Sequence, residues 1–311
     1  MKRIVLFLCV ALACSVVYAD TSVGARLQQV SVNVKAGRSQ GSGLIVLAEV
    51  DGKITTWIVT ANHVVDGLRQ VKTVIDADGS DKKQVSYMDA EVVQEKVVNG
   101  RGVGEKKFFA KVMSVDPRRD VALLRVRADD EFRVGALFYL NEEIPQPGTA
   151  LFHCGAPGGQ DLGGTCSLTD GIVSRVGVNI SQFGGSEHGI YDQITCPAQP
   201  GSSGGLVALS DDGRVVGIIT LGVRGADSFH WMVPIRSILA FAKDTGAAWI
   251  FDPSVEPPVS ESDIKLKLEV NPSGFSVSSK SNGQTKYMID YGKNQSTDAF
   301  IDVYDLLFPR N

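Results

Sequence analysis

Three short segments of the chain carry residue types that could perform nucleophilic catalysis, and one of them holds a serine among glycines. Residues 199–205 read QPGSSGG, with glycine at 201, 204 and 205. Glycines there would let the backbone turn sharply and approach a substrate carbonyl closely. Hydrolysis of an amide at neutral pH needs an activated nucleophile and N–H donors for the developing oxyanion. Ser203 is the candidate nucleophile, and Gly201, Ser202 and Ser203 are the candidate oxyanion-hole residues.

A histidine and an aspartate earlier in the chain could activate this serine. His63 follows the β-type run 55–60, so its side chain would project from the end of a rigid strand. Asp120 immediately precedes the apolar run 121–126, and a carboxylate part-buried there needs a polar partner, which the N–H of His63 would provide. We therefore take His63 as the candidate general base and Asp120 as the residue that orients it. Asp116 is the rival acid, but its position before a proline is typical of a turn.

The elements that must position these residues are mainly short strands. Val/Ile-rich runs follow one another closely and are separated by glycine, Asp-Gly or proline, which favours an all-β barrel or sandwich over a βαβ architecture. Helical patterns are scarce, and we expect a single turn over 63–68 and a helix over 234–243. The predicted strands include 30–34, 43–48, 55–60, 121–126, 171–178, 206–209, 215–221 and 229–235.

The candidate segments occur in an order that resembles one family of enzymes, the chymotrypsin-fold serine proteases and especially their Deg/HtrA type. The resemblance covers about residues 27–245. It implies two six-stranded antiparallel β-barrels, with His63 and Asp120 from the first barrel and Ser203 from the second, and polypeptides as substrates. The segments that carry it are TANHVV (60–65), DPRRDVALL (116–124), PGSSGG (200–205), GSGLIV (41–46), TDGIVS (169–174), GIIT (217–220) and MVPI (232–235).

Some features depart from that family's pattern. Ser202 stands where the family usually has Asn or Asp, which changes a side chain but keeps the backbone amides. The stretch between His63 and Asp120 is longer than usual, and residues 76–107 are predicted to be a polar insertion. No PDZ domain is recognisable after the protease part, so the family's peptide-sensing regulation is in doubt. A homo-oligomer is therefore only a weak expectation.

The residues expected to contact the substrate side chain follow from the same resemblance. Pro197 stands six residues before Ser203, where this fold sets the floor of the specificity pocket, and the absence of an acid there argues against a preference for Arg or Lys. We expect small or medium apolar side chains to be preferred, while His230 could instead favour an acidic one. The predicted walls consist of Thr220, Leu221 and Gly222 on one side and residues 229–232 on the other.

The ends of the chain predict export and an added segment. Residues 1–19 have a basic head, an apolar body and a small-residue cleavage signal, which is the pattern of a secretory signal peptide. We expect a periplasmic or secreted protein without a transmembrane segment after cleavage; a lipoprotein anchored at Cys14 is the alternative. The remaining predicted parts are a protease domain over 20–250 that divides near 130–145, a linker over 251–262, and a small β-type extension over 263–311.

Composition and the remaining motifs narrow the possible partners and cofactors. The formal net charge is only −4, so nucleic acid is not an expected partner, because phosphate binding needs a concentrated basic surface. The four histidines show no ligand spacing, so no metal or other cofactor is expected. Three cysteines remain after signal cleavage; Cys154 and Cys166 could pair, or all three could be buried thiols.

Two other functions are compatible with parts of this pattern. An α/β-hydrolase esterase would share the Gly-x-Ser-x-Gly pattern of residues 201–205, but its acid and histidine would have to follow the serine within alternating strands and helices. A catalytically impaired binding or chaperone-like protein could keep the protease fold, because function resides in the site. The presence of all three candidate residues favours the serine endopeptidase.

Overall fold

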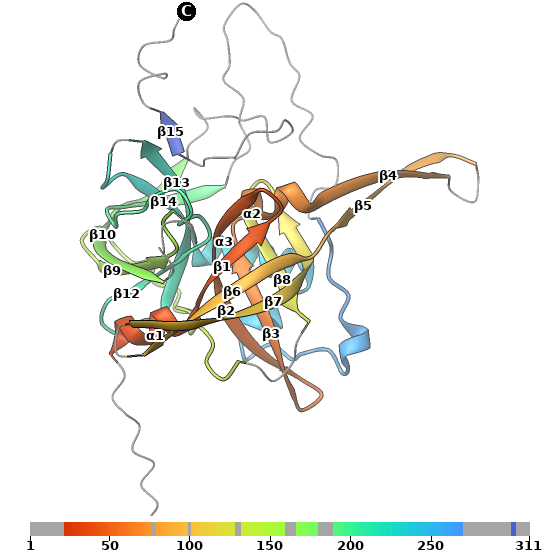
Figure 1. Ribbon diagram of the computed structural model, residues 1–311, viewed down its shortest axis with the longest axis horizontal. Coiled ribbons are helices and arrows are strands. Elements are labelled where there is room, and N and C mark those ends of the chain that lie inside the picture. Colours follow the sequence, from red (N-terminus) through yellow and green to blue (C-terminus); the bar gives the residue numbers. More distant parts are fainter. Residues whose placement is uncertain are drawn as a thin grey trace, which may run out of the picture.

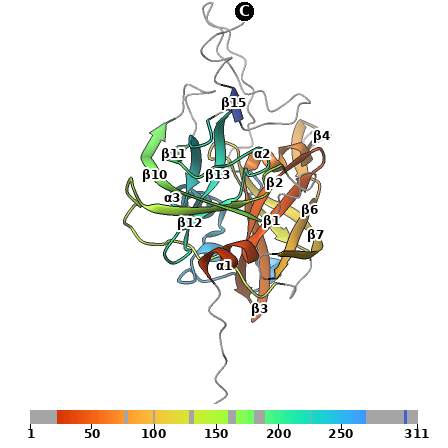
Figure 2. The same cartoon turned by 60° about the vertical axis from the view of Figure 1, so that its left-hand side comes forward.

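The fold consists of two β-barrels and a few helices (Figures 1 and 2). The computed structural model describes residues 22–75, 79–98, 101–127, 132–158, 166–179, 189–224, 226–269 and 300–302. The predicted signal peptide, including Cys14, lies outside these residues, as does most of the predicted C-terminal extension. The predicted all-β class with two six-stranded antiparallel barrels is confirmed.

In the first barrel six antiparallel strands close on themselves and carry His63 and Asp120 at their ends. The strands, in the order of their pairing, are β1 (Ser31–Ala36), β2 (Ser39–Val50), β3 (Lys53–Thr60), β8 (Val121–Val126), β7 (Arg101–Asp116) and β6 (Ala90–Val98). The β2–β3 turn consists of Asp51 and Gly52, whose φ angles are 51° and 69°. Two positive φ angles define a type I′ turn, for which Asp-Gly is a favoured sequence. Trp57, Ile58 and Leu124 are fully buried in the core.

The second barrel carries Ser203 in the loop that leads into one of its strands. Its six strands, in the order of pairing, are β9 (Ala150–Gly155), β10 (Ser167–Asn179), β11 (Ile190–Ile194), β14 (His230–Pro234), β13 (Val215–Arg224) and β12 (Leu206–Leu209). β12 pairs with both β9 and β13, and this double pairing closes the barrel. A short strand, β15 (Phe300–Asp302), runs parallel to the end of β13. Residues 127–149 connect the two barrels.

The region predicted as a polar insertion, residues 76–107, consists largely of strands where the structure describes it (79–98 and 101–107). β4 (Arg69–Ile75) and β5 (Asp81–Tyr87) form a separate hairpin that projects from the first barrel (Figure 1), and β6 and the start of β7 continue the barrel sheet. Val71 and Ile75 on this hairpin are 48% and 77% exposed. A strand with water on both faces need not alternate apolar and polar residues, and so the periodicity that reveals a strand is missing here.

The helices are short and pack against strands of the barrels. The turn predicted over 63–68 is confirmed as α2 (Asn62–Val65) followed by the 3₁₀ turn η1 (Asp66–Leu68). The predicted helix over 234–243 is α3 (Ile235–Thr245), which begins one residue later because Pro234 is its cap. Gly246 ends α3 in the left-handed conformation at φ 83°. The sequence did not predict α1 (Val23–Val30), which includes the residue expected to begin the first strand.

After α3 the chain returns to the first barrel and packs against it. α4 (Ala248–Phe251), in which Trp249, Ile250 and Phe251 are buried, ends at the first residue of the predicted linker, and a 3₁₀ turn, η4 (Glu261–Asp263), follows. Residues 264–269 are extended, and Val115 of β7 donates a 2.8 Å hydrogen bond to the carbonyl of Leu268. Glu269 is buried and accepts hydrogen bonds from Arg69 Nε and Tyr87 Oη, each at 2.8 Å. The start of the predicted extension therefore packs on the first barrel.

Candidate active site

His63 and Asp120 form a buried pair at the ends of two strands of the first barrel. β3 ends at Thr60 and leads into α2, while Asp120 directly precedes β8. The Nδ1 atom of His63 lies 2.8 Å from Asp120 Oδ2, and the backbone N–H of His63 donates to Oδ1 at 2.9 Å. Because an ionised carboxylate only accepts hydrogen bonds, Nδ1 carries the proton, which leaves Nε2 of a neutral ring as the basic atom.

A third donor to this carboxylate comes from the second barrel. Thr220 of β13 donates its hydroxyl to Asp120 Oδ2. Burial alone would raise the pKa of Asp120, but the charge and hydrogen bonds of His63 and the Thr220 hydroxyl together hold it below its ordinary value. Thr220 was predicted as a wall of the specificity pocket, and the structure adds that its hydroxyl contacts the candidate catalytic acid. No local pattern around Thr220 marks this contact, because its partner lies 100 residues away in the sequence.

The Ser203 loop begins with a tight turn that orients the amide of Gly201. The N–H of Ser202 donates to the carbonyl of Gln199 at 2.9 Å, and Gly201 has φ 98°. Proline followed by glycine in the middle of a turn, with positive φ at the glycine, is the pattern of a type II turn. The Pro200 carbonyl accepts a 2.7 Å hydrogen bond from the N–H of Gly158. Since N–H and C=O point in opposite directions across a trans peptide, the N–H of Gly201 points away from Gly158.

The predicted oxyanion-hole residues differ in how their amides are used. Among the residues that the structure describes, the amides of Gly201 and Ser203 donate no hydrogen bond, whereas that of Ser202 is engaged in the turn. The Ser202 hydroxyl accepts a hydrogen bond from the N–H of Gln199 at 3.3 Å. Gly201 and Ser203 therefore remain the candidate donors, and Ser202 acts on the shape of the loop.

Ser42, which was not predicted as a site residue, joins the first barrel to the Ser203 loop. Its N–H donates to the Ser203 carbonyl at 2.7 Å, and its hydroxyl donates to the Gly201 carbonyl at 2.8 Å. A Cβ on Gly41 would come 2.8 Å from the Ser203 carbonyl and 2.5 Å from Val64, the neighbour of His63. Only glycine at 41 lets the three segments approach this closely.

The predicted pocket residues lie on β13 and β14, which follow the Ser203 loop in the chain, and on the segment that precedes the loop. Leu221 and Gly222 pair with Trp231 and His230 across β13 and β14. His230 is 1% exposed, and its ring interacts with the backbone of Ala198 and Cys196, next to Pro197. Burial holds the pKa of His230 below its ordinary value. His230 is therefore a neutral side chain packed against the segment predicted to form the pocket floor.

The cysteines and the remaining candidate ligands do not form a further site in the part of the chain that the structure describes. Cys154, Cys166 and Cys196 are free and buried, so the pairing considered for Cys154 and Cys166 is not formed. No group of three or more His, Cys, Asp or Glu side chains among the described residues could hold a metal ion. No helix in the described ranges is long and apolar enough to span a membrane.

The two barrels, with His63 and Asp120 on the first and the Ser203 loop on the second, have the arrangement of the chymotrypsin fold. The family model of the trypsin-like peptidase domain matches residues 41–218, more than half of the chain. The chain therefore belongs to the trypsin-like peptidase family and is homologous to the Deg/HtrA proteases.

Individual relatives support the same family. "Putative protease Do-like 14" of Arabidopsis thaliana is 28% identical over 207 residues, 66% of this chain and 41% of the relative. "Serine protease Do-like HtrA" of Bacillus subtilis is 29% identical over 208 residues, 66% of this chain and 38% of the relative. The chain thus spans about two fifths of these relatives' length. The solved structure "HtrA-type protease AlgW with tripeptide" has a TM-score of 0.51 at 20% identity, covers 71% of this chain and 62% of its own, and shares the fold.

His153 beneath the Ser203 loop should make stability depend on pH. It is 2% exposed, its Nδ1–H donates to the Leu206 carbonyl at 3.0 Å, and burial lowers its pKa from 6.5 to about 4. Between these values the unfolded chain binds more protons, so the free energy of unfolding should fall as the pH drops from 6.5 to 4, by up to about 3 kcal/mol. Denaturant titrations at several pH values in this range should show that the free energy of unfolding changes less steeply with pH in His153→Leu than in the wild type. Equal slopes for both proteins would contradict the prediction.

Proposed function

We propose that the chain is a serine endopeptidase that hydrolyses peptide bonds of polypeptides through an acyl-enzyme. The observation that carries the proposal is the buried His63–Asp120 pair, in which both carboxylate oxygens accept hydrogen bonds from His63. This pairing fixes the tautomer that a general base needs. The glycine-rich Ser203 loop, docked on the first barrel through Ser42, supplies the candidate nucleophile and amides.

The proposed mechanism divides the reaction into two acyl transfers. Ser203 Oγ attacks the scissile carbonyl while His63 Nε2 takes its proton, and Asp120 stabilises the resulting imidazolium. The amides of Gly201 and Ser203 stabilise the negative oxygen of the tetrahedral intermediate. His63 then gives the proton to the departing amine, and a water activated by the same histidine releases the acyl group from Ser203.

We further propose that the chain is exported, with exported or misfolded proteins as its substrates. The support is the basic head and apolar body of residues 1–19, which are followed by a small-residue cleavage signal. When the full-length gene is expressed in a host with a secretory pathway, the mature protein should begin at Asp20 and lie outside the cytoplasm. N-terminal sequencing of fractionated cells tests this. An intact N-terminus in the cytoplasmic fraction would contradict it, and a lipid on Cys14 would support the anchored alternative.

The nucleophile is tested by a variant that changes one atom. The mature protein should cleave unfolded casein and be labelled by a fluorophosphonate probe, and Ser203→Ala should lose both, with turnover lower by a factor of about 10³ or more. Ser202→Ala is the matched control, because it removes a neighbouring hydroxyl and keeps both candidate amides. Labelling that persists in Ser203→Ala would overturn the assignment. Absence of turnover and labelling in wild type and variant alike would favour the binding or chaperone-like protein.

The substrate preference is proposed to be for small or medium apolar side chains before the scissile bond. The ring of His230 occupies space against Ala198 and Cys196, which limits the room at the predicted pocket floor. His230→Gly should therefore raise kcat/KM for peptides with Leu or Phe at that position by about tenfold or more, compared with peptides that have Ala there. Each buried methylene changes the free energy of binding by about 1–3 kcal/mol. A peptide library that varies this position measures the preference. Cleavage after Glu or Asp by wild type, lost in His230→Gly, would instead establish the acidic preference.

A further inference from the structure

The turn that presents Asp120 holds the backbone in an unfavourable conformation. Asp120 has φ 56°, and it stands between β7 and β8 at the end of the turn formed by residues 116–120. A non-glycine residue in the left-handed region is uncommon and costs on the order of 1–3 kcal/mol. Such a conformation persists only where surrounding contacts determine it. The contacts that hold this turn therefore decide where the carboxylate of Asp120 lies.

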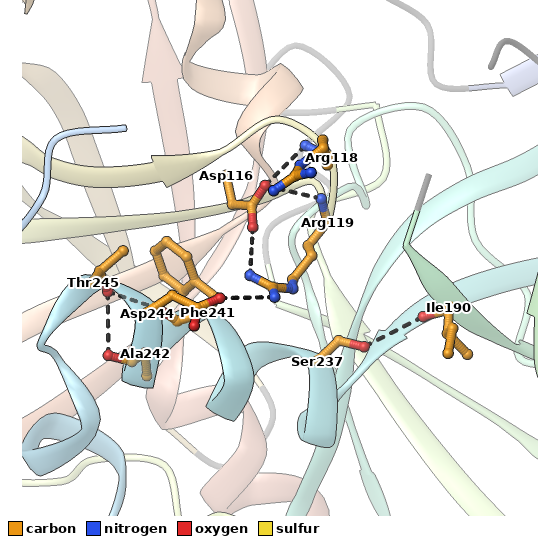
Figure 3. A network of polar contacts seen from close by, with 9 residues as sticks. All are labelled: Asp116, Arg118, Arg119, Ile190, Ser237, Phe241, Ala242, Asp244 and Thr245. Atoms are coloured by element: carbon orange, nitrogen blue, oxygen red, sulfur yellow. Dashed lines mark hydrogen bonds and ion pairs between the residues drawn. The ribbon is translucent and has the colours of Figure 1, made fainter. Parts of the chain in front are cut away.

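A second, fully buried carboxylate holds the turn from inside. Asp116 has no solvent exposure, and its Oδ1 accepts hydrogen bonds from the backbone N–H groups of Arg118 at 3.0 Å and Arg119 at 3.3 Å (Figure 3). Its Oδ2 accepts a 2.7 Å hydrogen bond from Arg119 Nη1. A buried carboxylate needs such partners, and the turn provides all three of them. The network thus fixes the backbone immediately before Asp120.

The same turn is attached to the second barrel at two points. Arg119 Nη2 donates to Asp244 Oδ2, in the last turn of α3, at 2.8 Å (Figure 3). The N–H of Gly189, which precedes β11, donates to the Arg118 carbonyl at 3.0 Å. The end of α3 is itself well defined, because the Thr245 hydroxyl donates to the carbonyl of Phe241 at 2.9 Å. One guanidinium therefore connects the buried carboxylate of the first barrel to the last turn of α3, the helix that follows β14.

We propose that Asp116 is a positioning residue for the candidate catalytic acid, Asp120. In this proposal Arg119 and Asp244 connect the turn that Asp116 fixes to α3. This inference rests on the proposed function, since it concerns the placement of Asp120 against His63. Asp116 touches neither His63 nor Asp120 in any contact that the structure records, so its effect passes through the backbone. Its loss should weaken catalysis without weakening substrate binding.

Asp116→Asn tests the role of the buried carboxylate with almost no change in volume. The amide keeps one acceptor oxygen but turns two donor hydrogens toward Arg119 or the backbone N–H groups, so the turn should relax away from φ 56° at Asp120. We expect kcat to fall by about tenfold or more and KM to change less than twofold. The acid limb of the pH profile of kcat/KM should move to lower pH, because a displaced carboxylate stabilises the imidazolium less.

Asp212→Asn is the matched control, because Asp212 makes the same kinds of contacts in a different turn. It accepts hydrogen bonds from the Arg214 N–H at 2.8 Å and from Arg214 Nε at 2.5 Å, between β12 and β13. Its kcat and pH profile should match wild type. Asp66 interacts electrostatically with His63, as well as with Arg69, Glu269 and Asp120, so the profiles are repeated with Asp66→Asn to exclude its titration as the cause of a shift. An unchanged kcat and acid limb in folded Asp116→Asn would overturn the proposal.

Two further measurements keep the inference testable if Asp116→Asn folds poorly or the protein proves inactive. Asp244 is 45% exposed in its side chain, so Asp244→Asn should fold, and we expect a two- to fivefold lower kcat with an unchanged KM.

The Nδ1 proton of His63, hydrogen-bonded to a carboxylate, should give a low-field proton resonance that disappears in His63→Ala. Asp116→Asn should shift or broaden this resonance whether or not the wild type turns over substrate, so failure of the proposed function and failure of the inference can be told apart. An unaltered resonance would overturn the inference.

Discussion

The carboxylate of Asp120 is buried, and the structure around the site depends on how it is satisfied. An isolated buried carboxylate would be protonated, because the free energy lost on removing its charge from water exceeds the stabilisation that an apolar interior provides. Here His63 contributes two donors from the first barrel and Thr220 one from the second. The charge is therefore fully stabilised only when the barrels are docked, so assembly of the candidate site and association of the barrels are coupled.

The Ser203 loop is held to the first barrel by contacts that exclude side chains. Gly204 has φ 84°, and a Cβ there would come 2.2 Å from the Ser42 carbonyl and 2.3 Å from Thr60 Oγ1. The Thr60 hydroxyl donates to that same carbonyl at 2.6 Å. Glycine is needed at this position both for its conformation and for the space that it leaves. The glycines beside Ser203 thus serve the docking of the loop as well as its turn.

Much of the fold and part of the site could be predicted because they depend on local patterns. Buried strands such as 121–126 are apolar apart from one residue, Arg125, and Asp120 and His63 stand at the ends of strands. The contacts of Ser42 with Ser203 and of Thr220 with Asp120 could not be found this way, since the partners are 161 and 100 residues apart in the sequence. The β4–β5 hairpin was missed because its strands are solvated on both faces.

Ser202 differs from the residue usual in the family, and the backbone conformation of its turn compensates for the difference. The resembling proteases usually have Asn or Asp there, whose side chains accept hydrogen bonds from nearby backbone N–H groups. The Ser202 hydroxyl accepts from the N–H of Gln199, a weaker bond at 3.3 Å, while Pro200 and Gly201 already favour the type II turn through their own φ preferences. Because the turn is determined by backbone conformation, the side chain at 202 has less to contribute. The amides that the proposed chemistry uses belong to the neighbours of Ser202, and this division lets the side chain vary while the candidate oxyanion hole is kept.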